Sequence, residues 1–186
     1  MYDKQAGGNQ LLNPQEILEK KVKLGYGSYV GALGCGPKAY FTFQAARIAG
    51  DKGLVYAVDI QKDILSSVES HAKANAFDNV RTVWSNLEIY GATKIPESSL
   101  DLSMLVNVLF QSTNMPEMIK EAIRLIKKGG KLLIIDWKDI GTPIGPSGEK
   151  RVNPEKIKEY TEIFGMKLEQ EFEAGLYHFG QIFIKN

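Results

Sequence analysis

The chain has 186 residues, 44% of them hydrophobic, which suits one compact unit with a full core better than two domains. Its 23 basic and 22 acidic residues give a formal net charge of +1, so no net field attracts polyanions and we expect no nucleic-acid partner. The single cysteine, Cys35, excludes an internal disulfide, and neither a charged leader nor an apolar run of about 20 residues is found; we therefore expect a cytoplasmic protein without a membrane span.

Helices and strands are predicted to alternate along the chain. Asn13 and Pro14 favour a helix start, and Ile17, Leu18 and Val22 follow it at amphipathic spacing. From residue 28 on, apolar runs and glycine turns predict a strand at Ser28–Leu33, a helix at Ala39–Ile48, a strand at Leu54–Val58, a helix at Lys62–Asn75, strands at Val80–Trp84 and within Ser99–Leu109, a helix at Pro116–Ile126, a strand at Lys131–Asp136, a helix at Asn153–Phe164, and strands at Met166–Glu173 and Tyr177–Ile184.

This order of elements indicates an α/β fold. Five strands alternating with helices favour a doubly wound parallel sheet, whose ligands lie beyond the carboxyl ends of the strands. The last two strands are joined by the short turn Ala174-Gly175-Leu176, which leaves no room for a crossover helix, so they must pair antiparallel. We predict a Rossmann-like seven-stranded sheet, mostly parallel with an antiparallel C-terminal hairpin strand, in a single domain over residues 1–186.

A glycine-rich turn and an acid mark the expected binding edge. The first strand leads into Ala32-Leu33-Gly34-Cys35-Gly36-Pro37-Lys38, and the second is followed by Asp59. Glycines let the backbone approach a ligand closely and adopt positive φ, while an acid at the end of the next strand can accept hydrogen bonds from ribose hydroxyls. The pattern predicts a site for a nucleoside-containing ligand.

Further segments make this pattern specific enough to resemble one known family. They are Leu33 to Pro37 with Tyr40-Phe41-Thr42, Val55 to Ile60, Ser85-Asn86-Leu87-Glu88, Leu100-Asp101 through Val106 to Leu109, and Leu125 through Gly129 to Leu133. With the C-terminal hairpin, they make residues 11–186 resemble a class I S-adenosylmethionine-dependent methyltransferase of the small ubiquinone/menaquinone-biosynthesis-like group. The resemblance implies S-adenosyl-L-methionine as cofactor and an unidentified small-molecule acceptor. It also implies three parts within the domain: a covering segment with a helix at 1–27, a cofactor-binding core at 28–140, and a lid-like loop, helix and hairpin at 141–186.

The resemblance also implies which residues bind the cofactor: Ala32, Gly34, Cys35, Gly36, Asp59, Ile60, Asn86, Leu87 and Asn107. In the family pattern the glycines pass under the methionine and ribose portions and the acid binds the ribose, although a purely structural turn and a helix N-cap at Asp59 stay open. Cys35 is expected to pack behind the loop rather than to react.

The remaining positions concern the adenine and the methyl group. Ile60 would pack on the adenine, Asn86 would hold its amino group, and Leu87 would offer its backbone N–H to a ring nitrogen. Asn107 would face the methionine and the transferred methyl. The structural alternatives are an Asx-turn at Asn86 and simple strand termination at Asn107.

Two positions depart from the family pattern. Ala32 stands where an acid usually helps to hold the methionine ammonium, and Lys38-Ala39 replace a further glycine. Lys38 would either repel the sulfonium or neutralise the methionine carboxylate. These departures support an alternative function, a non-catalytic binding or regulatory module on the same fold; a dinucleotide oxidoreductase is a third hypothesis that the missing last glycine disfavours.

Methyl transfer depends mainly on alignment, so no catalytic residue is assigned and no metal site is expected. If the acceptor needs a general base, Asp136 and His178 are the candidates. The glycine- and proline-rich segment 141–148 is expected to lie across the acceptor pocket as a lid, with an ordinary exposed linker as the alternative.

Overall fold

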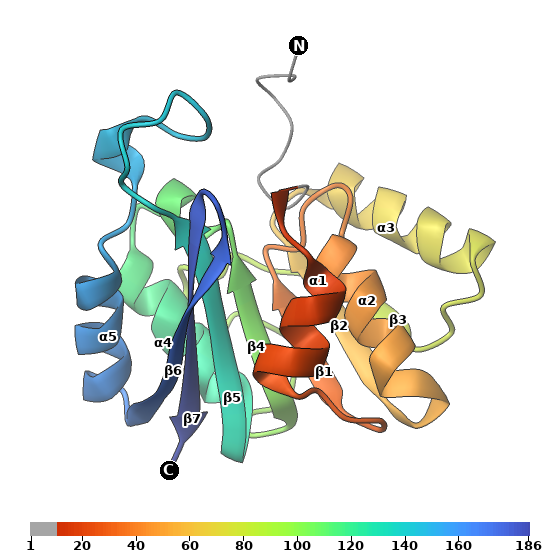
Figure 1. Cartoon of the computed structure of the whole chain (residues 1–186). Coiled ribbons are helices and arrows are strands. Elements are labelled where there is room, and N and C mark those ends of the chain that lie inside the picture. The colour runs from red at the N-terminus through yellow and green to blue at the C-terminus, as the bar shows by residue number, and fades with distance from the viewer. Residues whose placement is uncertain (1–10) are drawn as a thin grey trace.

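A computed structural model describes residues 11–186 of the chain as a central sheet with helices on both faces (Figure 1). Residues 1–10, which belong to the predicted covering segment, lie outside the described part. The strand order is β3-β2-β1-β4-β5-β7-β6. The strands are β1 (Tyr29–Leu33), β2 (Leu54–Asp59), β3 (Val80–Trp84), β4 (Leu100–Val106), β5 (Ile126–Trp137), β6 (Met166–Gly175) and β7 (His178–Lys185).

The pairing of the strands confirms the predicted fold class. β3, β2, β1, β4 and β5 pair in parallel with their neighbours, whereas β7 is antiparallel to both β5 and β6. A two-residue turn, Leu176-Tyr177, joins β6 to β7. Since such a turn leaves no crossover, it reverses β7 within the sheet, as the sequence predicts.

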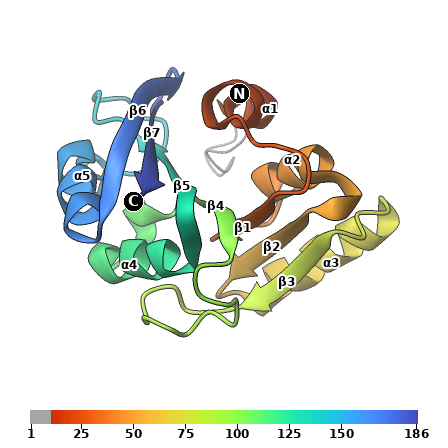
Figure 2. The ribbon, with the colours of Figure 1, turned by 90° about the horizontal axis from the view of Figure 1, so that it is seen from below.

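Helices cover the two faces of the sheet in two groups (Figure 2). Apolar side chains of the N-terminal helical segment, α2 and α3 pack on one face, and those of α4 and α5 on the other. The helices are α1 (Pro14–Glu16), the π-helix η2 (Ile17–Val22), α2 (Tyr40–Ala49), the 3-10 helix η3 (Gly50–Lys52), α3 (Lys62–Ala74), the 3-10 helix η4 (Leu109–Gln111), α4 (Met115–Leu125), the 3-10 helix η5 (Gly148–Lys150) and α5 (Pro154–Ile163). Within residues 11–186, no helix combines the length and the hydropathy needed to cross a bilayer.

The predicted helix caps are confirmed, but the first helix differs in its winding. Asn13 accepts a hydrogen bond from Glu16 N, and Asn153 accepts one from Glu155 N. Beyond Glu16 the first helix widens into η2, which ends at a left-handed Lys23. The wider turn brings the apolar residues of η2 to one face, where all three of them are buried: Ile17, Leu18 and Val22.

β4 lies within the predicted range and ends at Val106, and the apolar Leu109 begins a 3-10 turn. The start of β5 was predicted wrongly. Residues 127–130, which lie between the predicted helix and the predicted strand at Lys131–Asp136, belong to β5 as an irregular stretch. Ile126 pairs with Leu100 and Lys131 pairs with Leu102. The stretch has more residues in β5 than in β4, and such an insertion forms a bulge.

Side chains along β5 alternate between the two faces of the sheet. Leu132 and Ile134 pack toward α4 and α5, while Leu133 and Ile135 pack toward α2 and the N-terminal segment. Because both faces are covered there, β5 is apolar from Leu132 to Ile135, between the lysines of its amino-terminal half and Asp136 near its carboxyl end. The polar residues that follow β1, β2 and β4 lie at the same edge of the sheet.

Candidate functional site

The loop after β1 is held in a conformation that requires glycine. Gly34 and Gly36 have φ of 75° and 66°. The N–H groups of Gly34 and Cys35 both donate to Val58 O, at 2.8 and 3.0 Å, which ties the loop to β2. A Cβ on Gly34 would lie 2.6 Å from Val108 Cγ2, whereas a Cβ on Gly36 would meet nothing within 4 Å. Gly34 is therefore required by packing, and Gly36 borders open space that a ligand can occupy.

Asp59 lies at the carboxyl end of β2 and is bonded to this loop. Its Oδ2 accepts from Gly36 N at 3.1 Å, and its Oδ1 accepts from Gln61 N at 3.0 Å. The N-cap of α3 is Gln61, two residues further on. A carboxylate offers about four acceptor positions, so Asp59 retains capacity for hydroxyl donors. The structure thus brings the predicted glycine loop and the predicted acid together.

Cys35 is buried beside Asp59, with its Sγ 3.9 Å from Asp59 Oδ2. Burial, and then the negative charge of Asp59, raise the pKa of the Cys35 thiol to about 12. The thiol therefore stays protonated at neutral pH and is no nucleophile. Its place behind the loop agrees with the packing role expected from the sequence.

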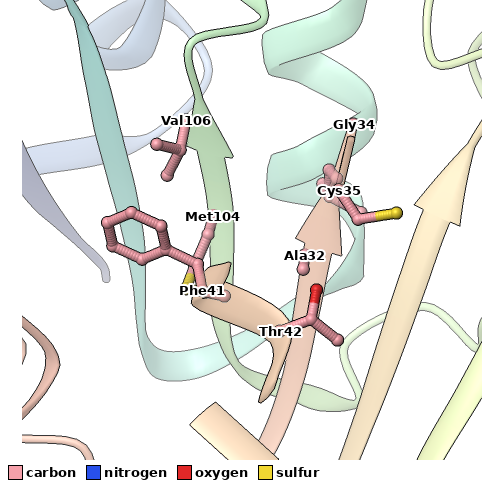
Figure 3. A pocket seen from close by; sticks show the side chains of 8 residues that line it. Ala32, Gly34, Cys35, Phe41, Thr42, Met104 and Val106 are labelled. Atoms are coloured by element: carbon pink, nitrogen blue, oxygen red, sulfur yellow. The ribbon is translucent and has the colours of Figure 1, made fainter. Parts of the chain in front are cut away.

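A small pocket lies between β1, β4 and α2 (Figure 3). Its lining consists mainly of apolar side chains and loop backbone: Ala32, Leu33, Gly34, Cys35, Phe41, Thr42, Met104 and Val106. Thr42 is 1% exposed, and its Oγ1 has no hydrogen-bond partner. The segment around Thr42 helps to carry the family resemblance, but no role could be given to its hydroxyl from sequence, because an unpaired buried oxygen is visible only in three dimensions.

The residues expected to hold the adenine lie at the ends of β2 and β3. Ile60 leaves 53% of its surface exposed, and its carbonyl accepts from Trp84 Nε1 at 2.8 Å. Asn86 Oδ1 accepts from Glu88 N at 3.0 Å, so the Asx-turn is present, and Leu87 is buried behind it. An exposed isoleucine beside this turn offers an apolar surface on which a flat ring can pack.

Asn107 directly follows β4 and is in a left-handed conformation, with φ of 53°. Its N–H donates to Ile135 O at 2.9 Å, and its carbonyl accepts from Gln111 Nε2 at 3.1 Å. These bonds fix a backbone shape that a non-glycine residue adopts at a cost. Asn107 therefore both terminates the strand and stands at the edge where the glycine loop opens.

Two aromatic rings contact each other in a tilted arrangement at the carboxyl end of β5. Trp137 and His178 are register partners whose ring centroids are 4.2 Å apart at an interplanar angle of 41°. They are 3% and 0% exposed, and neither Trp137 Nε1 nor either ring nitrogen of His178 has a partner among the described residues. Burial, and then the charge of Lys138, lower the pKa of His178 to about 4, so the imidazole is neutral at pH 7.

The second candidate base, Asp136, lies on the other face of the sheet, because side chains alternate along a strand. It accepts from Trp137 N at 2.8 Å and from Phe110 N at 3.3 Å, which anchors the turn after β4. Burial raises the pKa of Asp136 to about 7. The structure does not bring Asp136 and His178 together.

Residues 141–148, here called the lid loop, receive several hydrogen bonds from the side chain of Arg151. The Arg151 guanidinium donates to four main-chain carbonyls, those of Lys138, Thr142, Ile144 and Pro146. A Cβ on Gly145 would lie 2.6 Å from the Trp137 ring, so the loop backbone packs directly against the indole. The lid loop thus lies against the Trp137 indole at Gly145.

Comparison with known proteins places these features in context. A family model described as "Methyltransferase domain" matches residues 32–175. A SAM-dependent methyltransferase from Aquifex aeolicus superposes with a TM-score of 0.86 at 22% identity, covering 100% of both chains. A candidate type 11 methyltransferase from Sulfolobus solfataricus has a TM-score of 0.73 at 26% identity over 95% of this chain and 94% of that one. The [4+2]-cyclase SpnF has a TM-score of 0.75 at 12% identity over 92% and 79% of the chains, so the fold also serves another reaction.

Proposed function

This chain belongs to the methyltransferase-domain family, and we propose that it transfers a methyl group from S-adenosylmethionine to a small acceptor. The enzyme class and the cofactor follow from the family. The ubiquinone/menaquinone-like subgroup and the identity of the acceptor stay predictions. Within residues 11–186, no group of three or more His, Cys, Asp or Glu side chains is placed to hold a metal ion.

The observation that carries the proposal is the open space beside Gly36, bordered by a buried acid. Gly36 donates to Asp59 Oδ2, and a Cβ on Gly36 would meet nothing within 4 Å. A backbone without side chains next to an acceptor for hydroxyl groups fits an adenosyl ligand. In the proposed arrangement Asp59 receives the ribose hydroxyls, Ile60 packs on the adenine, and Asn86 and Leu87 border the ring.

The cofactor, when bound, supplies an electrophilic methyl group on a sulfonium, and the protein supplies alignment. The left-handed Asn107 and the loop at Gly34 fix the backbone around the reacting end. The buried thiol of Cys35 stays protonated and does not compete as a nucleophile.

The acceptor is proposed to bind at Trp137 and His178. Three buried ring nitrogens without partners cost about 1–3 kcal/mol each, so a ligand that pairs them gains that free energy on binding. A neutral imidazole offers one donor and one acceptor, and the indole offers a donor, which fits a small acceptor carrying a hydroxyl or amino group. The lid loop must move from Trp137 to admit it, which requires Gly145 to leave the indole and the bonds of Arg151 to the loop carbonyls to break.

A non-catalytic module remains the second candidate, because Ala32 contributes no carboxylate to the pocket. The two functions differ in cofactor turnover but share the adenosyl site. Single-turnover assays with labelled S-adenosylmethionine and a panel of small hydroxyl and amine acceptors separate them. Labelled product establishes the enzyme, and binding without transfer to any acceptor favours the module.

The cofactor site itself is tested by Gly36→Ala with Gly129→Ala as the matched control. Both glycines have positive φ, 66° and 77°, and at both a Cβ would meet open space, so the backbone strain is similar. Only Gly36 borders the proposed site. Calorimetry with S-adenosylhomocysteine should show affinity reduced at least tenfold in Gly36→Ala and unchanged in Gly129→Ala; equal effects would contradict the placement of the cofactor.

A further inference from the structure

One hydroxyl in the pocket of Figure 3 is buried without a hydrogen bond. Thr42 lies in the first turn of α2, 1% exposed, and its Oγ1 has no partner. The other fully buried helical threonine behaves differently: Thr161 Oγ1 bonds to Ile157 O and Lys158 O, both at 2.9 Å. Thr161 bonds to the preceding helical turn, but no helical turn precedes Thr42, so the buried Oγ1 of Thr42 is left for a group that enters the pocket.

The surroundings of this hydroxyl show which kind of group it can receive. Thr42 Oγ1 is the only side-chain oxygen in the pocket lining, whose other members supply methyl, thioether, thiol and phenyl groups and loop backbone. Ala32, across the pocket on β1, presents only a methyl group, as Figure 3 shows. The cavity encloses about 10 Å³, room for one group of the size of water or ammonium.

The pocket also lies next to the glycine loop, on the side away from the adenine-binding residues. Its lining includes Gly34 and Cys35 of the loop and Val106 at the end of β4, whereas Ile60 and Asn86 follow β2 and β3. A cofactor whose ribose meets Asp59 and whose adenine packs on Ile60 must direct its other end toward β4. In S-adenosylmethionine that end is a zwitterionic amino-acid group.

We infer that the Thr42 hydroxyl binds the amino-acid end of the cofactor and takes the place of a carboxylate at position 32. A hydroxyl has two lone pairs and one proton, so it can either accept from the ammonium or donate to the carboxylate of that end. The inference rests on the proposed function. It explains how a pocket with Ala32 on its wall retains a polar contact for a charged group.

The test compares two ligands in one variant. Thr42→Val removes the hydroxyl at nearly constant shape, and Thr42→Ser keeps it. S-adenosylhomocysteine carries the amino-acid end, whereas 5′-methylthioadenosine has the same adenosine and thioether without it. Thr161→Val is the control for the substitution itself, because Thr161 lies in α5, away from the pocket.

Calorimetry should show the affinity of Thr42→Val for S-adenosylhomocysteine reduced about tenfold or more, and its affinity for 5′-methylthioadenosine unchanged. Thr42→Ser should stay within about threefold of the wild type for both ligands. An unchanged affinity of Thr42→Val for S-adenosylhomocysteine, or an equal loss for the two ligands, would overturn the inference while leaving the proposed function in place. If the wild type binds neither ligand, the proposed function fails and the inference fails with it.

Discussion

Replacing Asp59 by alanine separates its structural bonds from its proposed contact with the ribose. Asp59 accepts from Gly36 N and Gln61 N, so its removal leaves the part-buried Gly36 N–H without an acceptor, at a cost of about 1–3 kcal/mol in stability. Separately, the loss of charge-assisted bonds to the ribose hydroxyls weakens the binding free energy by roughly 1.5–3 kcal/mol. This corresponds to an affinity lower by about ten- to a hundredfold.

Asp101→Ala is the matched control for this variant. Asp101 Oδ2 accepts from Tyr29 N at 2.9 Å, and Asp101 Oδ1 pairs with Lys127 at 2.6 Å, so its loss also removes an acceptor for a main-chain N–H. It lies near the amino end of β4, at the opposite edge of the sheet. Thermal unfolding should show both variants destabilised, and calorimetry with S-adenosylhomocysteine should show reduced affinity in Asp59→Ala alone. Equal affinity in the two variants would refute a ribose contact.

Three further outcomes are expected. Because burial lowers the pKa of His178 from 6.5 to about 4, folding disfavours its protonation, and the contribution of His178 to stability is full above pH 6.5 and falls by roughly 3 kcal/mol as pH drops to 4. Burial raises the pKa of Asp136 to about 7, so Asp136 contributes the opposite trend over this range. In chemical unfolding measured from pH 7 to pH 4, the stability of the wild type relative to His178→Phe should therefore fall by the His178 contribution. Arg151→Ala should make the lid loop a site of rapid proteolysis while leaving the unfolding midpoint nearly unchanged, and uniform resistance would contradict its fastening role. Ala39→Gly should be neutral or stabilising, because Ala39 has φ of 45° and glycine adopts this conformation without strain. Lys38→Gly should destabilise the protein by up to about 1 kcal/mol. A lower Tm for Ala39→Gly than for Lys38→Gly would contradict the loop geometry.

The fold was predictable because local signals agreed with one another. Apolar runs separated by glycine turns gave the order of strands and helices, and the short turn before β7 required a reversed strand. Parallel strands end at one edge of a sheet, so the sequence alone predicts that the glycine loop and Asp59 lie together, and Gly36 N donates to Asp59 Oδ2.

What failed depended on register and on neighbours distant in sequence. The turn was predicted at residues 174–176, but it consists of Leu176 and Tyr177, and this register sets Trp137 opposite His178. Lys38 and Ala39 stand where the family pattern has a further glycine, and of the two it is Ala39 that is left-handed. The free hydroxyl of Thr42 and the widening of the first helix follow from packing against other elements, which periodicity alone does not encode.

Titration of the purified chain with S-adenosylhomocysteine in a calorimeter, with NAD as the comparison ligand, tests the central claim most directly. The account predicts a one-to-one complex with S-adenosylhomocysteine and no heat with NAD, because Gly36 and Asp59 border a site for an adenosyl group and the last glycine of a dinucleotide loop is missing. No binding of S-adenosylhomocysteine at millimolar concentration, or a preference for NAD, would contradict it.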